Sequence, residues 1–223
     1  ASAPAAAFWS EGSSKSAGSG TTPPTPATWP GLVPQVTWGW IPVEAGAPSS
    51  RYPYEQRWTG VMAAALGEGY QIIEEGLSAR TTSVDDPIDP RLNGARYLPS
   101  ALASHMPLDL VILMLGTNDT KVVYRRSTHD IAQGVAKLVA QIMGSAGGVG
   151  TLYPAPKTLV VAPPPIKHIG IPWFEYALEG AEEKTKGFAA QYEAMAGFMG
   201  AAFLDAGSVI TADGVDGIHF TAD

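Results

Sequence analysis

The sequence predicts an α/β fold in which helices cover a parallel β-sheet, and three observations support this prediction. Strand-like segments alternate with segments that carry apolar residues at helical spacing, the order expected of parallel βαβ units. Residues 108–115 form an almost continuous apolar run, which is typical of a central parallel strand buried on both faces. A chain of 223 residues with 45% hydrophobic and 16% charged residues can also bury the core of a single domain.

The individual elements follow from local patterns in chain order. A helix is expected over residues 54–66, where apolar residues recur at helical spacing up to Gly67, and a short strand over residues 70–75. The run at 108–115 gives the next strand, and a second helix is expected over residues 128–143. The last three expected elements are the strand 158–162, which three prolines stop, the helix 182–199 and the strand 202–204.

Residues 1–36 differ in composition from the rest of the chain. Ala, Ser, Gly, Pro and Thr fill 27 of these 36 positions, and the only charges are Glu11 and Lys15. Such a segment buries too little apolar surface to offset the entropy lost on ordering, so most of it is expected to be linker-like. The folded domain is therefore expected to comprise residues 37–223.

The composition narrows the classes of function. A net charge of −7 and a pI near 5.0 argue against a surface that binds nucleic acid. Because the chain has no cysteine, a disulfide framework and thiolate metal sites are excluded. The most apolar run, residues 108–115, is too short to cross a bilayer. We therefore expect a soluble, cytoplasmic protein that binds neither nucleic acid nor membranes.

An aspartate stands three residues before a histidine near the end of the chain, in Asp216-Gly217-Ile218-His219. A histidine can take a proton from a serine hydroxyl and return it to a leaving group. A carboxylate on its other ring nitrogen fixes the tautomer and stabilises the imidazolium. The alternative is a capped turn beside a structural histidine, which is the commoner origin of an isolated Asp-x-x-His pattern.

Two other candidate segments are expected at the same edge of the sheet, because ligands bind beyond the carboxyl ends of parallel strands. Asn118, in Gly116-Thr117-Asn118-Asp119, follows the strand at 108–115, and Gly76 follows the strand at 70–75. The Asn118 amide can donate to a developing oxyanion, and the Gly76 backbone N–H can join it. The alternative for Asn118 is a simple turn, in which Gly, Asn and Asp are all favoured.

Together these motifs resemble those of the SGNH (GDSL-type) serine hydrolases, in particular the bacterial arylesterase/acyltransferase branch. The resemblance extends over residues 37–223 and includes Thr37-Trp38-Gly39-Trp40 and Glu74-Glu75-Gly76-Leu77-Ser78-Ala79-Arg80. It implies a three-layer, flavodoxin-like SGNH hydrolase fold with a parallel central sheet. It also places Trp38 and Trp40 beside the expected site, where they would either wall an acyl pocket or belong to the core.

The resemblance also implies a function. It implies a serine carboxylesterase that hydrolyses short-chain esters through an acyl-enzyme, without a metal or other cofactor. Members of this branch also pass the acyl group to alcohols or peroxide, and they tend to form homo-oligomers. His219 would be the general base of a Ser-His-Asp triad, Asp216 would orient it, and Gly76 and Asn118 would form the oxyanion hole.

The serine of that triad is not found where the resemblance places it. In this branch Gly-Asp-Ser-Leu precedes Thr-Trp-Gly-Trp, whereas here Val33-Pro34-Gln35-Val36 does, so that Gln35 takes the nucleophile's place. A glutamine amide is not a useful nucleophile, and Pro34 lacks a backbone N–H. Residues 28–32 do not have the pattern of a central strand, and the family's helix beyond the histidine has no counterpart before Asp223. The domain is therefore expected to lack its first strand and its C-terminal helix, which would expose apolar surface and favour self-association.

Three interpretations of the missing serine remain open. Residues 1–36 could differ from the native N-terminus of this fold, for example through a shifted reading frame. The nucleophile could instead be Ser14, because Gly12-Ser13-Ser14-Lys15-Ser16-Ala17-Gly18 mimics the Gly-x-Ser pattern. In the third interpretation the chain is a catalytically impaired relative that binds a small ligand or another protein. Ser78 and Ser145 are poor substitutes, since neither has the flanking glycines of a nucleophile elbow.

Overall fold

The structure is a computed structural model that describes residues 27–32 and 38–222. The strands are β1 (Ala27–Leu32), β2 (Tyr70–Glu74), β3 (Leu110–Leu113), β4 (Lys157–Ala162) and β5 (Ala202–Asp205). The helices of the described residues are α2 (Trp58–Leu66), α3 (Gly94–His105), α4 (Thr128–Met143), α5 (Pro172–Ala177), α6 (Ala181–Lys186) and α7 (Phe188–Met199). Within this described part, no helix has both the length and the apolarity needed to cross a membrane.

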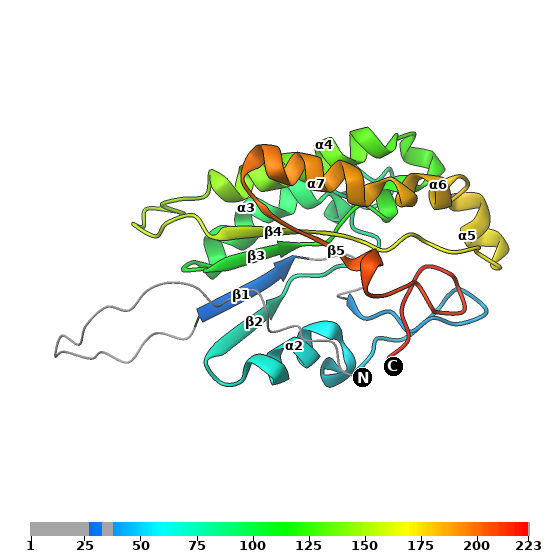
Figure 1. The fold of residues 1–223 in the computed structure, drawn as a ribbon, viewed down its shortest axis with the longest axis horizontal. Coiled ribbons are helices and arrows are strands. Elements are labelled where there is room, and N and C mark those ends of the chain that lie inside the picture. The colour runs from blue at the N-terminus through cyan, green and yellow to red at the C-terminus, as the bar shows by residue number, and fades with distance from the viewer. Residues whose placement is uncertain (1–26, 33–37, 223) are drawn as a thin grey trace.

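The strands form one parallel sheet in the order β2-β1-β3-β4-β5. Helices α3, α4 and α7 cover one face of this sheet, and α2 lies on the other face (Figure 1). The molecule therefore has three layers, and the predicted α/β fold with a parallel central sheet is confirmed.

β1 occupies a position for which the sequence predicts no strand, because Pro30 and Gly31 are unfavourable in a central strand. In the structure it runs parallel between β2 and β3, with Ala27 paired to Tyr70 and Leu32 paired to Leu113. This corrects the prediction that the first strand is missing. The physical reason is that β2 and β3 each present a row of backbone groups that need partners, and tertiary pairing outweighs local strand preference.

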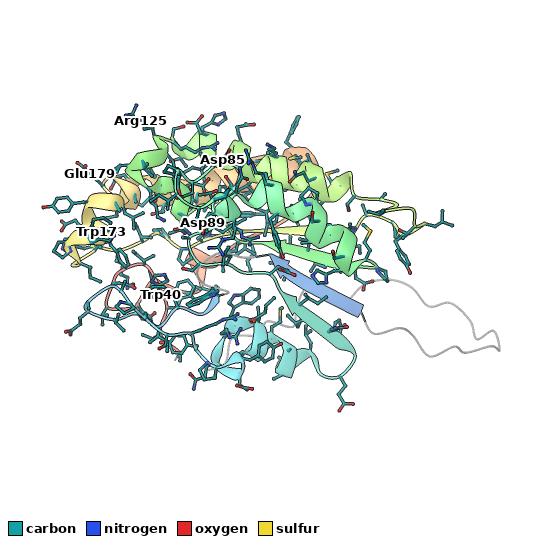
Figure 2. The ribbon with its side chains drawn as sticks, turned by 180° about the vertical axis from the view of Figure 1, so that it is seen from behind. Trp40, Asp85, Asp89, Arg125, Trp173 and Glu179 are labelled. Atoms are coloured by element: carbon teal, nitrogen blue, oxygen red, sulfur yellow. The ribbon has the colours of Figure 1, made fainter. Side chains whose placement is uncertain are left out.

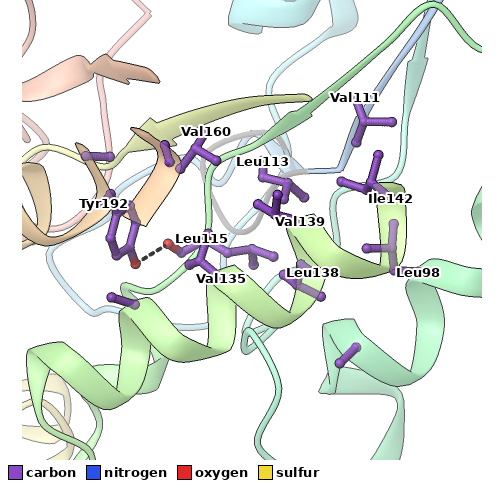
Figure 3. Packing of buried hydrophobic residues seen from close by; sticks show 14 of the residues in the cluster. Leu98, Val111, Leu113, Leu115, Val135, Leu138, Val139, Ile142, Val160 and Tyr192 are labelled. Carbon is purple, nitrogen blue, oxygen red and sulfur yellow. Dashed lines mark hydrogen bonds between the residues drawn. The ribbon is translucent and has the colours of Figure 1, made fainter. Parts of the chain in front are cut away.

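The main core lies between the sheet and the layer of α3, α4 and α7. The structure confirms the helix predicted over 128–143 with the same bounds, and Ser127 and Asp130 cap it reciprocally through their side chains and backbone N–H groups. Its apolar stripe packs against Leu113 and Val160 of the sheet (Figure 3). Five residues of that stripe are at most 1% exposed: Ile131, Val135, Leu138, Val139 and Ile142.

α3 is a helix that the sequence patterns do not predict, because it contains Pro99. A proline inside a helix has no N–H for the carbonyl four residues earlier, which here belongs to Ala95. In the structure the Ala95 carbonyl accepts a hydrogen bond from Nε2 of Gln141 on α4, at 2.8 Å. The neighbouring helix therefore satisfies the acceptor that the proline leaves free.

The single helix predicted over 182–199 is divided into α6 and α7 at Gly187. This junction packs against the start of α4, where Oγ1 of Thr128 donates to the Lys184 carbonyl at 3.1 Å. A Cβ atom at position 187 would lie 3.0 Å from Cγ2 of Thr128. The close approach of α4 therefore favours glycine at this junction.

The α2 side of the sheet is covered less completely than the opposite side. Trp58 and Met62 of α2 pack there against a small buried cluster formed by Ile112, Met114, Val161 and Ala206. Leu204 of β5 remains 45% exposed, and the described residues after Ser208 contain no helix. The self-association predicted from exposed apolar surface on the sheet stays a prediction.

Candidate active site

Asp216 and His219 form a buried hydrogen-bonded pair on the last loop of the described chain. Nδ1 of His219 lies 2.6 Å from Oδ2 of Asp216, and the two side chains are 3% and 0% exposed. The other carboxylate oxygen, Oδ1, accepts hydrogen bonds from the backbone N–H groups of Ile218 and His219, each at 2.9 Å. Both carboxylate oxygens are therefore fixed in the position that holds the imidazole.

The surroundings of Asp216 keep it ionised. Burial by itself would raise the pKa of this carboxyl, but the hydrogen bond and charge of His219 and the two backbone donors outweigh burial and hold the pKa below its usual value. An ionised carboxylate on Nδ1 requires the neutral imidazole to carry its proton on that nitrogen. The other nitrogen, Nε2, is then left with a free lone pair.

Glycines shape the loop that carries this pair. Gly217 has φ of +70°, and a Cβ atom there would lie 2.5 Å from the His168 carbonyl oxygen. The Gly217 carbonyl accepts a hydrogen bond from the Lys167 N–H at 2.8 Å, which docks the loop on the segment after β4. Ile218 packs beside it into a buried cluster with Ile166, Ile169, Ile171, Leu178 and Ala181. The turn between the two polar residues is therefore held rigidly on both sides.

Trp40 covers the imidazole of His219. Their rings are stacked with centroids 5.6 Å apart and planes 21° apart, and the ring centroid of Trp38 lies 5.8 Å from that of Trp40. Figure 2 shows Trp40 beside the C-terminal loop. Among the described residues, neither Nε2 of His219 nor Nε1 of Trp40 has a hydrogen-bond partner, although both atoms are buried. The structure thus brings one predicted pocket residue onto the predicted base and leaves the basic nitrogen available.

Asn118 lies at the carboxyl end of β3, as predicted, and is only 2% exposed. Its Nδ2 donates to the backbone carbonyl of Arg80 at 3.2 Å. The adjacent Asp119 accepts from Thr82, through the backbone N–H at 2.9 Å and through Oγ1 at 2.6 Å. Two successive side chains of the 116–119 segment therefore clamp the loop that follows β2.

Within that loop the structure draws attention to Ala79, which the sequence patterns do not single out. Ala79 has φ of +67°, a left-handed conformation that is costly for a residue with a Cβ atom. Among the described backbone–backbone hydrogen bonds of turns and loops, none has the Ala79 N–H as its donor. Gly76 lies earlier in the loop, two residues after the end of β2, and its role stays a prediction. Ala79 adjoins Arg80, the residue that contacts Asn118, so Ala79 is an additional candidate donor to an oxyanion.

The buried carboxyl of Asp119 leads to a prediction about stability. Burial raises its pKa to about 6, although Thr82 and Arg126 favour the carboxylate. Because the folded-state pKa is raised, the group stabilises the fold most at low pH, and this contribution is lost as pH rises through about 6. The free energy of unfolding of Asp119→Asn relative to the parent should therefore rise with pH, by up to ~1.4 kcal/mol per pH unit between about pH 4 and 6.

Urea unfolding of both proteins at several pH values measures this difference. Asp130→Asn is the matched control, because hydrogen bonds from Ser127 hold the pKa of Asp130 below its usual value. A lowered pKa contributes stability that is lost only in more acidic solution. The difference in free energy of unfolding between Asp130→Asn and the parent should therefore not change with pH above about pH 4.5. Parallel behaviour of the two variants would mean that Asp119 does not titrate in this range.

The serine that would complete this site is not among the residues that the structure describes. Ser14, Pro34 and Gln35 all lie outside the described residues. Ser78 and Ser145 are the two serines that the sequence marks as poor substitutes for the nucleophile. The hydroxyl of Ser145 already has a structural partner, because its Oγ donates to the Ile142 carbonyl at 2.7 Å at the end of α4. Leu32 pairs with Leu113, so β1 ends at the same sheet edge as the segment that carries Asn118. Within the described chain, no group of three or more His, Asp or Glu residues could hold a metal ion.

Comparison with known proteins adds independent findings. A model of the GDSL-like lipase/acylhydrolase family matches residues 12–223. The chain is 60% identical to a carbohydrate acetylesterase from Sinorhizobium meliloti and to an aryl esterase from M. smegmatis, in each case with a TM-score of 0.87 over 88% of this chain and 91% of the other. A second member of the carbohydrate acetylesterase family from S. meliloti is 33% identical, with a TM-score of 0.81 over 88% of this chain and 90% of the other. A search of curated proteins finds no match.

Proposed function

Because the chain belongs to the GDSL-like lipase/acylhydrolase family, we propose that it is a serine ester hydrolase acting on short-chain esters, with aryl and carbohydrate acetates as the substrate class. The observation that carries this proposal is the buried Asp216–His219 pair, whose free Nε2 has no partner among the described residues. The solved relatives that are named as aryl esterase and carbohydrate acetylesterase support the choice of substrate.

In the proposed mechanism a serine hydroxyl gives its proton to Nε2 of His219 while its oxygen attacks the ester carbonyl carbon. Asp216 stabilises the imidazolium that forms. The carbonyl oxygen becomes an oxyanion, and the Asn118 amide donates to it together with a backbone N–H of the loop after β2, from Ala79 or from Gly76. His219 then returns the proton to the leaving alcohol, which leaves an acyl-enzyme.

The second half of the reaction repeats these steps with a different nucleophile. A water molecule gives its proton to His219 and attacks the acyl-enzyme, which releases the acid and restores the serine. An alcohol or peroxide that takes the place of water would instead yield a new ester or a peracid. Trp40 stacks on the imidazole of His219, and Nε2 of that ring is buried; a site shielded from water in this way supports such acyl transfer. The homo-oligomeric state and the cytoplasmic location stay proposals.

The competing function is a ligand-binding relative without catalysis, favoured by Gln35 at the expected position of the nucleophile. Hydrolysis of an aryl acetate, combined with labelling by a serine-directed phosphonate, separates the two. We expect turnover that is lost in His219→Ala, and one phosphonate adduct whose position is mapped by mass spectrometry. An adduct on Ser14 would identify the nucleophile.

If the parent chain forms no adduct on any serine, the proposal of a working esterase fails for this chain. The same assay on the triple variant Val33→Gly, Pro34→Asp, Gln35→Ser then tests the rest of the site. An adduct at position 35 in that variant would show that only the nucleophile is missing. No adduct in either protein would favour the ligand-binding relative.

A further inference from the structure

We propose that Arg80 is a positioning residue for Asn118, held in place by the ring of Tyr97; this inference rests on the function proposed above. The backbone carbonyl of Arg80 accepts a hydrogen bond from Nδ2 of Asn118 at 3.2 Å in a buried environment. A primary amide has two N–H hydrogens, so this bond fixes one of them and leaves the other to donate to an oxyanion. The direction of the second hydrogen is therefore set by the position of the Arg80 carbonyl.

The side chain of Arg80 is confined in the interior. The residue is only 4% exposed, and the centre of its guanidinium lies 4.1 Å from the ring centroid of Tyr97. Among the described residues, Nε and Nη1 of Arg80 have no hydrogen-bond partner, whereas the guanidinium stacks on the ring of Tyr97. A shift of the Arg80 backbone would move a buried charge away from the ring that stabilises it.

Tyr97 is itself fixed by two elements of the fold. Its hydroxyl donates to a carboxylate oxygen of Glu75, the residue after β2, and the other carboxylate oxygen lies 2.5 Å from Nε2 of His105. Burial and the bond to Glu75 raise the pKa of Tyr97 to about 12, so the hydroxyl keeps its proton at neutral pH. Tyr97 and His105 both belong to α3, so the loop after β2 is tied to a helix of the main core.

These contacts hold the loop at a second point, besides the one held by Asp119. Asp119 binds Thr82, two residues after Arg80, while the Tyr97 stack holds Arg80 itself. Ala79, in its left-handed conformation, immediately precedes the residue held by this stack. The arrangement therefore preorganises the Asn118 amide, whose acceptor is the Arg80 carbonyl, before substrate binds.

A matched pair of variants tests the role of the ring. Tyr97→Leu removes the aromatic face, whereas Tyr97→Phe keeps it and loses only the bond to Glu75. We expect Tyr97→Leu to lower kcat by about tenfold with KM changed less than about twofold, because transition-state stabilisation is affected more than substrate binding. Tyr97→Phe should stay within about twofold of the parent.

A double-mutant cycle separates positioning from a general structural role. If Tyr97 acts through Arg80 and Asn118, then Tyr97→Leu should change kcat by less than about twofold when Asn118 is already alanine. The same tenfold loss in both backgrounds would overturn the proposal, since the effect would then not pass through the Asn118 amide. Should Tyr97→Leu fail to fold, Arg80→Met takes its place, because it keeps the apolar stem and removes the charge.

A measurement of hydrogen exchange, which does not require turnover, keeps this test independent of the proposed function. In nitrogen-15 labelled protein, the side-chain amide protons of Asn118 report their exchange with solvent. The proton that is bonded to the Arg80 carbonyl should exchange at least about fivefold faster in Tyr97→Leu than in the parent or Tyr97→Phe. Unchanged exchange would overturn the positioning role, whereas absence of turnover with accelerated exchange would contradict only the esterase function.

Discussion

Replacing Asp216 with asparagine is expected to lower kcat for hydrolysis of a short aryl ester by about four orders of magnitude, without loss of the fold. The reason lies in how the two carboxylate oxygens are used. Oδ1 accepts two backbone N–H groups, so the amide oxygen of an asparagine would keep that position and its NH₂ group would face His219. A donor opposite Nδ1 forces the imidazole proton onto Nε2, and this tautomer cannot accept a proton from a serine.

The measurement is kcat for a short aryl acetate, with circular dichroism to show that the variant is folded. Asp213→Asn is the matched control, because Asp213 lies on the same loop and accepts from the N–H and Oγ1 of Thr221 at 2.9 and 2.6 Å. Neither of these two hydrogen bonds involves a candidate catalytic residue, so kcat of the Asp213→Asn variant should remain within about twofold of the parent. Equal losses in the two variants would show that Asp216 serves only to shape the loop.

Elements of the fold could be predicted from the sequence where their own residues show a clear local pattern. α4 has an apolar stripe and a capping box within its own residues, so its bounds follow from local pattern alone. α3 and β1 contain prolines at unfavourable positions, and each depends on groups far away in the sequence. Gln141 satisfies the carbonyl that Pro99 frees, and β2 and β3 supply the backbone partners of β1. The pattern of neighbouring residues in the sequence does not reveal such distant hydrogen-bond partners.

The same distinction applies to the candidate site. Asp216 and His219 are only three positions apart, so one short loop brings the two side chains together and the motif predicts the contact. Asn118 was also predictable as a residue at the carboxyl end of a strand. Its partner was not, because the bond to Arg80 joins residues that are 38 positions apart. Ala79 gives no sequence signal at all, since alanine is not a residue that normally marks a left-handed conformation.

Packing beneath the Asn118 segment has a further consequence for stability. Gly116 has φ of +127°, and a Cβ atom there would lie 2.1 Å from the hydroxyl oxygen of Tyr192. That hydroxyl donates to the Leu115 carbonyl at 2.8 Å inside the main core (Figure 3), and Tyr192 is fully buried. A methyl group at position 116 would therefore have to displace a buried hydroxyl from its acceptor.

We accordingly expect Gly116→Ala to lower the free energy of unfolding by about 3 kcal/mol or more, measured by urea unfolding, because overpacking, backbone strain and a lost buried hydrogen bond act together. Gly67→Ala separates these causes, since Gly67 also has a positive φ of +77°, but a Cβ atom there would meet no described neighbour within 4 Å. Strain alone should cost that variant about 1–3 kcal/mol, without the lost hydrogen bond and the overpacking. Similar losses at both positions would mean that backbone conformation, and not the contact with Tyr192, limits substitution at Gly116.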